Sequence, residues 1–380
     1  MFKTLGIVFI VSSLLFWGWL YQTQYRGAST LDPADFKDPD KAELYRLIRD
    51  EYVEEVDMSE IDTTSLESMT QSLGDRYSFV LSDIDKNHQL KLNAGQYAGI
   101  GLSLENVEGY PTVVLTIKDS PAFTAGISEG DKLLEINGVP TATMTDADFK
   151  TALNTAVGDT VVLKTKGPEG ITEKTLTSEV FDFKTVFYNN LNNGLGYLRV
   201  TMFTVQTAFE LEELFGVLEQ DGIEALVLDF RGNGGGLING GDELLKAFIS
   251  EGKLYSQEFR NSPREEFWAE TPARFPDMKL VVLTDRSTAS MAELVALSLQ
   301  ENNRAVLIGE KTTGKGTMWR SFELPSGTLV NLSIGKWFGP SGRSIHKQGV
   351  TPDIPYFEPW NDKGELLEIA INAFNSNAPE

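Results

Sequence analysis

Hydrophobic residues are concentrated near the N-terminus, in an apolar run from Leu5 to Leu20 that only small or hydroxyl-bearing residues interrupt. The run is slightly long for the core of a cleaved signal peptide and slightly short for a full membrane span. Trp17, Trp19 and Tyr21 lie at its distal end, where aromatic side chains favour a membrane interface. We expect residues 1–26 to be an uncleaved signal anchor. A cleaved signal peptide is the second interpretation and a buried core helix the third. The first two place the body of the protein outside the cytoplasm.

Residues 27–93 are predicted to be a linker followed by an N-terminal helical region. The first part is polar and contains two prolines. From Lys41 to about Leu73, apolar residues such as Leu44 and Ile48 recur at the three- and four-residue spacing of an amphipathic helix. This spacing predicts helix over most of that stretch.

Residues 94–182 have the pattern of short strands separated by turns. Runs rich in valine, leucine and isoleucine alternate with turns that contain glycine, proline and asparagine. The runs cover residues 113–117, 132–136 and 161–164. One helix fits Asp146 to Ala156, with Thr145 as its N-cap. The pattern predicts a small, mostly-β module.

Residues 183–380 change to an α/β pattern. Near-continuous apolar runs, typical of strands buried on both faces, cover residues 224–230, 279–284 and 305–309. Helical stretches, 207–220 and 291–302 among them, separate these runs. Strand–helix–strand order implies parallel pairing through right-handed crossovers. The expected fold class is α/β: a core that contains a parallel sheet, an inserted mostly-β module and an N-terminal helical segment.

The composition excludes several classes of function. The chain of 380 residues carries a formal net charge of −22, whereas a surface that follows nucleic-acid phosphates is usually basic, so we expect no nucleic-acid partner. The absence of cysteine excludes disulfides, thiolate metal sites and a cysteine nucleophile. Asp83, Asp85 and Asn87 begin like a calcium loop, but the required glycine and closing glutamate are missing. We predict no metal.

Loops with unusual residues follow the three predicted strands of the α/β region. The first loop, 231–236, is rich in glycine, the second, 287–293, contains Ser290, and the third, 310–316, contains Lys315. Neighbouring parallel strands end at the same edge of a sheet, and sites form beyond those ends. The three loops are therefore expected to lie within reach of one another.

The three loops supply the groups that acyl transfer needs. Ser290 would be the nucleophile, and the N–H of Met291, at the start of the next helix, would point at an oxyanion. Gly234, Gly235 and Gly236 would supply further backbone donors, because only glycine leaves the backbone so accessible.

Lys315 would be the general base. The pKa of a free lysine is about 10.4, so in water the amine is charged at neutral pH. Burial in an apolar site lowers the pKa of a lysine enough to make it a base. Glycines on both sides of Lys315 permit close packing around the amine.

Each feature also has a purely structural interpretation. Ser290 and Glu293 have the spacing of a capping box, which needs no catalysis. Lys315 alone would be a solvated surface charge, and the glycine run alone would be a tight turn. Only the convergence of the three loops favours catalysis over these interpretations.

Two other chemistries fit less well. Residues 309–315 match the phosphate-loop spacing, but Gly316 stands where a magnesium-binding Ser or Thr is required, and strand-like alternation follows instead of a helix. His346 could pair with Ser290, but nothing in the sequence brings it or His88 to that serine. Both histidines are interpreted as surface or turn residues.

Several separate segments resemble the carboxy-terminal processing peptidases, also called tail-specific proteases. The likeness extends from about residue 41 to 358, and Ser290 and Lys315 are separated by the family's spacing of 25. Residues 287–293 resemble the nucleophile segment and 309–316 the lysine segment of this family. Residues 229–236 resemble the oxyanion loop of the family, with Gly234 where proline is common. Residues 339–345 and 349–354 resemble its closing motifs.

The resemblance implies a serine endopeptidase that cleaves protein substrates near their C-termini, without a cofactor. In such a family member the Ser290–Lys315 pair is catalytic, and the location outside the cytoplasm is the bacterial periplasm. Expected partners are proteins with exposed C-terminal tails, the membrane through the N-terminal segment, and either an activator protein or a second copy of the chain.

The resemblance also implies that residues 94–182 are a PDZ domain and residues 183–380 the peptidase core. The carboxylate-binding loop would be Gly99, Ile100, Gly101 and Leu102, whose amides would hold the tail while it adds as a strand. The helix predicted near 146–156 would form the other wall of the groove.

One residue departs from the family pattern. Trp319 stands four residues after Lys315, where the family commonly has a glutamine that orients the amine. This departure motivates an alternative function, a catalytically silent, membrane-tethered PDZ adaptor that binds protein C-termini.

Overall fold

The computed structural model describes residues 32–81, 96–107, 109–153, 155–182, 184–270, 272–356 and 363–376. The predicted anchor at 1–26 and the segment from Asp83 to His88 lie outside the described residues. None of the helices in the described ranges has the length and apolar character needed to cross a membrane.

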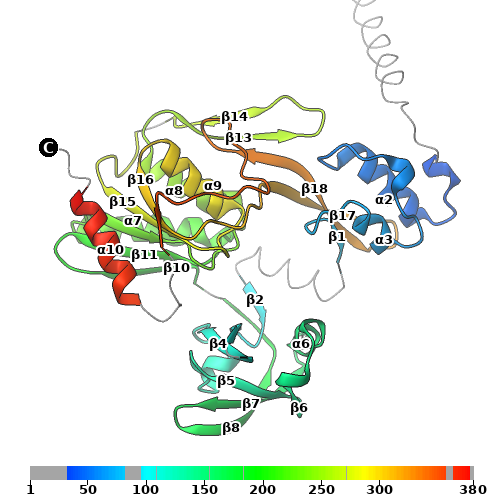
Figure 1. The fold of residues 1–380 in the computed structure, drawn as a ribbon, viewed down its shortest axis with the longest axis horizontal. Coiled ribbons are helices and arrows are strands. Elements are labelled where there is room, and N and C mark those ends of the chain that lie inside the picture. Colours follow the sequence, from blue (N-terminus) through cyan, green and yellow to red (C-terminus); the bar gives the residue numbers. More distant parts are fainter. Residues whose placement is uncertain are drawn as a thin grey trace, which may run out of the picture. The chain divides into compact units, whose positions relative to one another are not determined.

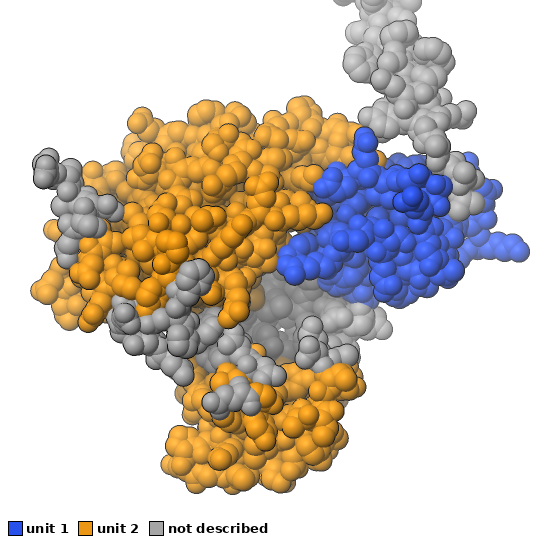
Figure 2. Space-filling view, viewed as in Figure 1, with its two compact units in different colours: residues 1–81, 319–335 blue, residues 82–318, 336–380 orange. Residues whose placement is uncertain are grey.

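The chain divides into two compact units, which Figure 2 colours separately. Unit 1 consists of residues up to 81 together with 319–335, and unit 2 consists of 82–318 together with 336–380. The N-terminal region therefore shares a unit with a segment that follows it by more than two hundred residues.

Unit 1 contains several short helices where the sequence predicted one long helical stretch. They are η1 (Pro33–Asp35), α2 (Pro39–Glu51), η2 (Met58–Glu60) and α3 (Leu66–Gln71). Asp38 caps α2 by accepting from the N–H groups of its first turn, and Ser65 caps α3 in the same way. Both caps, and the extended residue Tyr52 after α2, interrupt the helix that hydrophobic spacing alone suggested.

A strand pairing joins the N-terminal residues of unit 1 to its C-terminal segment. β1 (Phe79–Val80) pairs antiparallel with β18 (Leu329–Phe338), which itself pairs with β17 (Thr317–Glu323). The N–H of Leu81 donates to the carbonyl of Leu329 at 2.8 Å. β17 and β18 both cross the boundary between the units, because the boundary falls at 318/319 and 335/336.

The mostly-β module is a separate group of strands and short helices with its own core (Figure 1). Its elements are β2 (Gln96–Gly99), β3 (Leu102–Val107), β4 (Tyr110–Thr116), α5 (Pro121–Thr124), β5 (Lys132–Ile136), β6 (Val139–Pro140), η3 (Thr141–Thr143), α6 (Asp146–Leu153), β7 (Thr160–Gly167), β8 (Gly170–Thr177) and β9 (Glu179–Asp182). The sheet order β3-β4-β5-β7-β8 leaves β3 at an edge. β2 and β9 pair antiparallel and join the two ends of the module.

The remaining sheet has the order β10-β11-β12-β15-β16-β19. Its strands are β10 (Val186–Asn190), β11 (Leu195–Val200), β12 (Ala225–Asp229), β15 (Lys279–Thr284), β16 (Ala305–Gly309) and β19 (Ile354–Pro355). β10 is antiparallel to its neighbour, and the other pairs are parallel. Across the described sheets most strand pairs are antiparallel, and the parallel pairs described above belong to this sheet. The chain is a mixed α/β fold.

Helices cover both faces of this sheet. α7 (Val205–Gln220), α8 (Ile238–Phe248) and α9 (Met291–Glu301) share one buried cluster with residues of β12 and β15 such as Leu228 and Val282. α10 (Lys363–Ser376) packs on the other face against Val227 and Val281. Burial of both faces explains why these strands are apolar at successive positions. Outside the sheet, β13 (Lys253–Phe259) and β14 (Glu265–Trp268) form an antiparallel pair.

Candidate active site

Ser290 lies in the turn between β15 and α9, immediately before the helix. Its backbone has φ +56° and ψ −121°, a conformation that residues other than glycine rarely adopt. Such strain costs energy, persists only where the surrounding structure enforces it, and is concentrated at functional sites. The structure thus presents Ser290 at the first turn of α9, where N–H groups such as that of Met291 have no partner within the helix.

A fully buried carboxylate, that of Glu293, joins the serine loop to the lysine loop. Its Oε2 accepts from the N–H of Ser290 and from the N–H of Lys315, each at 2.8 Å. The backbone nitrogens of Ser290 and Lys315 are therefore separated by no more than the sum of these two hydrogen-bond distances. Oε1 accepts from the N–H of Gly314 at 2.7 Å and from the Thr312 hydroxyl at 2.5 Å. Burial raises the pKa of Glu293, and these four donors oppose that rise.

Further backbone bonds hold the lysine loop in place. The N–H of Thr313 donates to the carbonyl of Thr288 at 3.0 Å, beside the serine loop. On the other side, the N–H of Val350 donates to the Thr312 hydroxyl at 2.7 Å, and the N–H of Lys347 donates to the carbonyl of Gly314 at 2.8 Å. The segment that resembles the closing motifs therefore encloses the lysine loop.

The glycine loop packs directly on the serine. A Cβ atom at Gly235 would lie 2.6 Å from Cβ of Ser290, 2.7 Å from the carbonyl oxygen of Ala289 and 3.0 Å from the backbone nitrogen of Met291. Only glycine permits that approach, and its φ of +95° is likewise one that glycine adopts without strain. The predicted meeting of the first and second loops is thus visible in the backbone.

The structure leaves fewer N–H donors available in this loop than the sequence suggested. The N–H of Gly235 donates to the side-chain oxygen of Asn233 at 2.8 Å, so it is already occupied. The neighbouring Gly236 forms a bridge with Phe203, whose carbonyl oxygen would lie 2.0 Å from a Cβ there. The N–H of Gly234 and of Gly236, together with that of Met291, remain as candidate oxyanion donors.

Two buried polar side chains that the sequence analysis missed hold the loops together. Asp285 accepts from the N–H of Gly232 in the glycine loop and from the N–H of Thr288 in the serine loop. The side-chain amide of Asn233, which is fully buried, donates to the carbonyl of Val200 at 2.9 Å. The backbone carbonyl of Asn233 accepts from the N–H of Ala289, also at 2.9 Å. Neither has a sequence signature beyond lying next to a candidate loop.

A buried ion pair lies at the end of β12, where the glycine loop begins. Asp229 is fully buried and accepts two hydrogen bonds from the Arg231 guanidinium, at 2.9 and 2.6 Å. Tyr197 donates to the same carboxylate at 2.5 Å. Burial by itself would raise the pKa of Asp229, but the Arg231 charge and these bonds outweigh it and hold the pKa below its ordinary value.

The side chains of Lys315, Trp319 and His346 are described by their burial and by the elements that carry them. The side chain of Lys315 is partly buried, and its backbone is the part that the bonds above position. Trp319 lies on β17 and is partly buried. His346 packs against the lysine loop, since a Cβ at Gly316 would lie 2.3 Å from its backbone nitrogen. His346 is thus a turn residue, as expected, but one that supports this loop.

The predicted carboxylate-binding loop lies between β2 and β3. Gly101, with φ +81°, approaches Ser120 so closely that a Cβ would lie 2.1 Å from the serine Cβ. The carbonyl of Ile100 accepts from Ala122 at 2.9 Å, and its side chain is buried in the core of the module. Leu102 begins the edge strand β3. Gly99 ends β2 with a φ of +155°.

Comparisons with known proteins agree with this geometry. The sequence profile of peptidase family S41 matches residues 194–356, and that of the PDZ domain matches residues 98–169. The carboxy-terminal processing protease CtpA of Bacillus subtilis (strain 168) is 30% identical over 330 residues, which cover 86% of this chain and 71% of that protein. The carboxyl-terminal-processing protease of Synechocystis sp. (strain ATCC 27184 / PCC 6803 / Kazusa) is 30% identical over 335 residues, 85% of this chain and 78% of the relative.

A solved structure has the same fold. The photosystem II D1 C-terminal processing protease superposes with a TM-score of 0.59 at 22% identity, covering 86% of this chain and 94% of that one. The loops described above and these relatives lead to one conclusion: the chain belongs to peptidase family S41, the serine peptidases that include the carboxy-terminal processing proteases, and carries a PDZ domain.

Proposed function

We propose that this protein is a serine endopeptidase that cleaves protein substrates near their C-termini with Ser290 as nucleophile and Lys315 as general base. The observation that carries the proposal is the buried carboxylate of Glu293, one oxygen of which accepts from the backbone N–H of both residues. A general base must come within hydrogen-bond reach of the proton that it removes. The shared acceptor holds the two loops close enough for a lysine side chain to span the remaining distance.

The reaction follows from these roles. Neutral Lys315 takes the proton of the Ser290 hydroxyl as Oγ forms a bond to the scissile carbonyl carbon, whose π electrons move to oxygen. The tetrahedral intermediate collapses, the C–N bond breaks, and the leaving amine receives the proton from the lysine. Water then attacks the acyl carbon while the lysine again accepts a proton. The second tetrahedral intermediate collapses, the C–Oγ bond breaks, and Oγ of Ser290 receives the proton from the lysine as the carboxylic acid product forms. No cofactor takes part.

The oxyanion would be held by backbone donors of two loops. The N–H of Met291 lies at the start of α9, where the helix dipole favours negative charge. Gly234 and Gly236 would contribute from the glycine loop. Gly235 has a different role, because its N–H is bonded to Asn233 and its missing side chain makes room for Ser290.

The PDZ domain would bind the C-terminal tail of the substrate. β3 is an edge strand, so a tail can pair with it, and Leu102 and Leu104 on β3 and Phe149 on α6 are partly buried apolar residues that face the same core. The amides from Gly99 to Leu102 would hold the terminal carboxylate. These residues favour an apolar tail.

The location and assembly of the protein are also part of the proposal. The apolar run from Leu5 to Leu20 supports an N-terminal anchor, with residues from about 27 onward in the bacterial periplasm. An activator protein or a second copy of the chain would be a further partner.

One experiment tests the catalytic proposal. A fragment that begins near residue 27 is incubated with an unstructured peptide that has an apolar C-terminus, and the products are identified by mass spectrometry. Wild type should cleave the peptide, and Ser290→Ala and Lys315→Ala should each reduce the rate by about a thousandfold or more. Retained cleavage in either variant would refute the dyad. Equal tail binding by all proteins, with no cleavage by wild type even at saturating peptide, would favour the adaptor that Trp319 suggested.

A further inference from the structure

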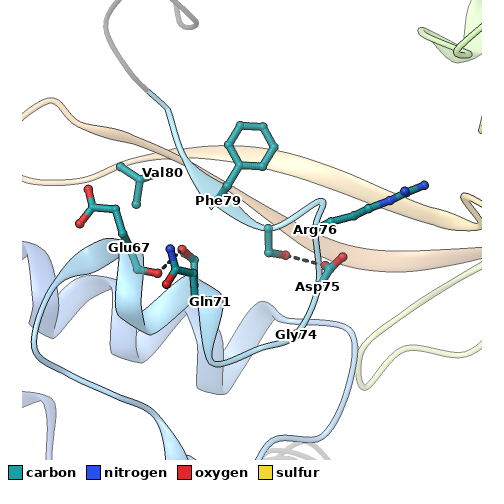
Figure 3. Close-up of a pocket in the computed structure, with 9 residues that line it drawn as sticks. Glu67, Gln71, Gly74, Asp75, Arg76, Phe79 and Val80 are labelled. Atoms are coloured by element: carbon teal, nitrogen blue, oxygen red, sulfur yellow. Dashed lines mark hydrogen bonds between the residues drawn. The ribbon is translucent and has the colours of Figure 1, made fainter. Parts of the chain in front are cut away.

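Unit 1 contains a pocket of about 520 Å³ that the peptidase mechanism does not use. α3 and the turn that leads into β1 line it (Figure 3). Its walls include Glu67 from the helix and Arg76, Phe79 and Val80 from the turn and strand. The volume is large enough to accept one or two side chains of a peptide.

The strand beside the pocket has a free edge. β1 lies at the end of its sheet, and among the described strands only β18 pairs with it. The bond from Leu81 to Leu329 and the partnership of Phe79 with Asn331 place both residues in hydrogen-bonded positions of the antiparallel ladder. Val80, between them, therefore directs its N–H and C=O away from β18. An extended chain could bond to these groups.

The apolar and charged groups at this edge are also exposed. The side chain of Phe79 is 42% exposed, so its apolar surface is accessible at this edge. Glu67 is exposed at the first turn of α3, and within the described part of the chain its carboxylate has no hydrogen bond or ion pair. In Figure 3 this carboxylate extends toward the strand that carries Val80.

The other charged groups at the pocket have partners. The two oxygens of Asp75 accept from the N–H of Tyr77 at 3.0 Å and from the Ser78 hydroxyl at 2.7 Å. The guanidinium of Arg76 donates to the Tyr77 hydroxyl and lies 4.8 Å from the centre of its ring. Among the charged side chains that line the pocket, Glu67 is the one without such a partner in the described part of the chain, and it is exposed.

The surroundings of the pocket are strongly acidic. Residues 32–81 contain 14 Asp and Glu but only 5 Lys and Arg, a net charge of −9. A field of this sign attracts cationic segments and repels acidic ones. Charge complementarity thus selects a polypeptide that carries lysine or arginine.

We propose that this pocket and the free edge of β1 form an exosite that binds an extended, lysine- or arginine-containing segment of the substrate. The segment would pair with Val80, place an apolar residue against Phe79 and direct a basic side chain toward Glu67. That the occupant is a substrate rests on the proposed function. Two points support a substrate as the occupant. In the chain, Lys315 is followed directly by β17 and then by β18, the strand that pairs with β1. A protease also binds its substrate in an extended conformation, which is the conformation that can pair with a strand edge.

The exosite can be tested by peptide binding without catalysis. Full-length protein with Ser290→Ala is titrated into a fluorescein-labelled, flexible 12-residue peptide with central lysines, and anisotropy is measured. An amidated C-terminus keeps the peptide from the carboxylate-binding loop. We expect saturable binding of this peptide and none of a matched peptide in which glutamate replaces lysine. Equal binding of both peptides would overturn the proposal.

Matched variants locate the binding surface. Glu67→Lys should weaken lysine-peptide binding by roughly five- to tenfold, and Glu67→Gln by less. Glu60→Lys makes the same charge change at an exposed site away from the pocket and should leave binding within about twofold. Val80→Pro removes the outward N–H, breaks no bond to β18, restricts the backbone at this position, and should also weaken binding. If Glu60→Lys weakens binding as much as Glu67→Lys, the effect is a general field and the exosite is refuted.

A second measurement separates this proposal from the proposed function. With active enzyme, Glu67→Lys should raise KM for a tail substrate that has upstream lysines and leave kcat unchanged. If wild type cleaves nothing while the lysine peptide still binds through Glu67, the catalytic proposal fails and the binding surface stands. If sedimentation shows a dimer that Glu67→Lys dissociates, the occupant is a second copy and the substrate exosite is refuted.

Discussion

At the residue scale, the carboxylate of Glu293 has the most demanding position in the molecule. Each of its oxygens accepts two hydrogen bonds, and the donors belong to the two loops that carry Ser290 and Lys315. If such a buried acceptor loses its donor, the acceptor is left without a hydrogen bond. If the acceptor is replaced by a donor, two donors face each other and both are left unpaired. In each case the fold is destabilised by the desolvation energy of the unpaired group.

We expect Glu293→Gln to impair catalysis far more than substrate binding. The amide NH₂ must face backbone N–H groups in either rotamer, so the spacing of the loops changes. The unfolding free energy should fall by about 1–3 kcal/mol, and kcat should fall by roughly ten- to a hundredfold with KM nearly unchanged. Steady-state kinetics and thermal unfolding check this. Glu301→Gln at the other end of α9 serves as the control, and equal kcat in both variants would contradict the prediction.

Two neighbouring glycines provide a second test at this scale. Gly235→Ala places a methyl group 2.6 Å from Cβ of Ser290, whereas a Cβ at Gly234 meets no atom within 4 Å. Gly235→Ala should therefore reduce kcat on the order of a hundredfold, while Gly234→Ala keeps both its N–H and most of its activity. Active-site titration with an acylating reagent would detect the difference. A large loss in Gly234→Ala would mean that the clash is not the cause.

Sequence reasoning could find some of these residues and not others. The spacing from Ser290 to Glu293 was visible as a capping box, and the N–H of Ser290 does donate to that glutamate. Nothing local indicated that the same carboxylate also binds the lysine loop, because that contact joins residues 22 positions apart. The bond that occupies the N–H of Gly235 was equally invisible, since it depends on the side-chain orientation of Asn233.

At the element scale, the end of β12 determines where the glycine loop begins. Asp229 is fully buried there and the Arg231 side chain is 25% exposed, so removal of one partner should cost less than the about 3–5 kcal/mol typical of a fully buried pair. The folded-state pKa of Asp229 lies below its ordinary value, so its contribution to stability is present above that ordinary value and is lost as pH falls through the folded value.

Asp229→Asn should therefore destabilise the protein most at neutral pH. The difference in Tm between wild type and variant should be large at pH 7 and shrink steadily below about pH 4. Differential scanning calorimetry across this range checks the sign. A difference that is constant with pH would show that the ionised form of Asp229 does not stabilise the fold.

The predicted carboxylate-binding loop provides Gly101 for a similar test, and Gly130, in the turn before β5, provides the control. Gly101→Ala meets the side chain of Ser120, whereas Gly130, which also has a positive φ, faces open space. Both substitutions strain the backbone, because both glycines have a positive φ. Only Gly101→Ala also clashes with a neighbouring side chain, so only this variant should distort the loop. Calorimetric titration with an apolar tail peptide should show binding weakened by about tenfold or more in Gly101→Ala alone. Similar losses in both variants would assign the effect to strain.

Hydrophobic pattern predicted the elements with a clear periodicity and missed at least one helix that lacks it. β12, β15 and β16 lie within the three predicted apolar runs. α8 was not predicted, because it contains Gly240 and Gly241 and its preceding residue supplies no side-chain cap. Its glycines are explained by packing, since a Cβ at Gly241 would lie 2.1 Å from the Met291 side chain. Long-range contact, rather than local propensity, stabilises this helix.

At the scale of the whole molecule, the PDZ domain is attached through one pair of strands. Gly99 is paired with Glu179, so residues 100–178 can be replaced by an Asn-Gly turn that closes a two-residue hairpin. The shortened protein should unfold cooperatively and cleave unstructured peptides with kcat within about threefold of wild type. KM for tail-bearing substrates should rise. Thermal unfolding and peptide kinetics check this, and loss of cooperative unfolding would show that the domain is required for the core to fold.

The order in which the loops follow one another along the chain has a consequence for biosynthesis. The lysine loop is completed only when Lys347 and Val350 bond to Gly314 and Thr312. Ser290 is synthesised before Lys347 and Val350, because it precedes them in the chain. If Lys315 is the general base, we expect the protein to stay inactive until synthesis has passed Val350.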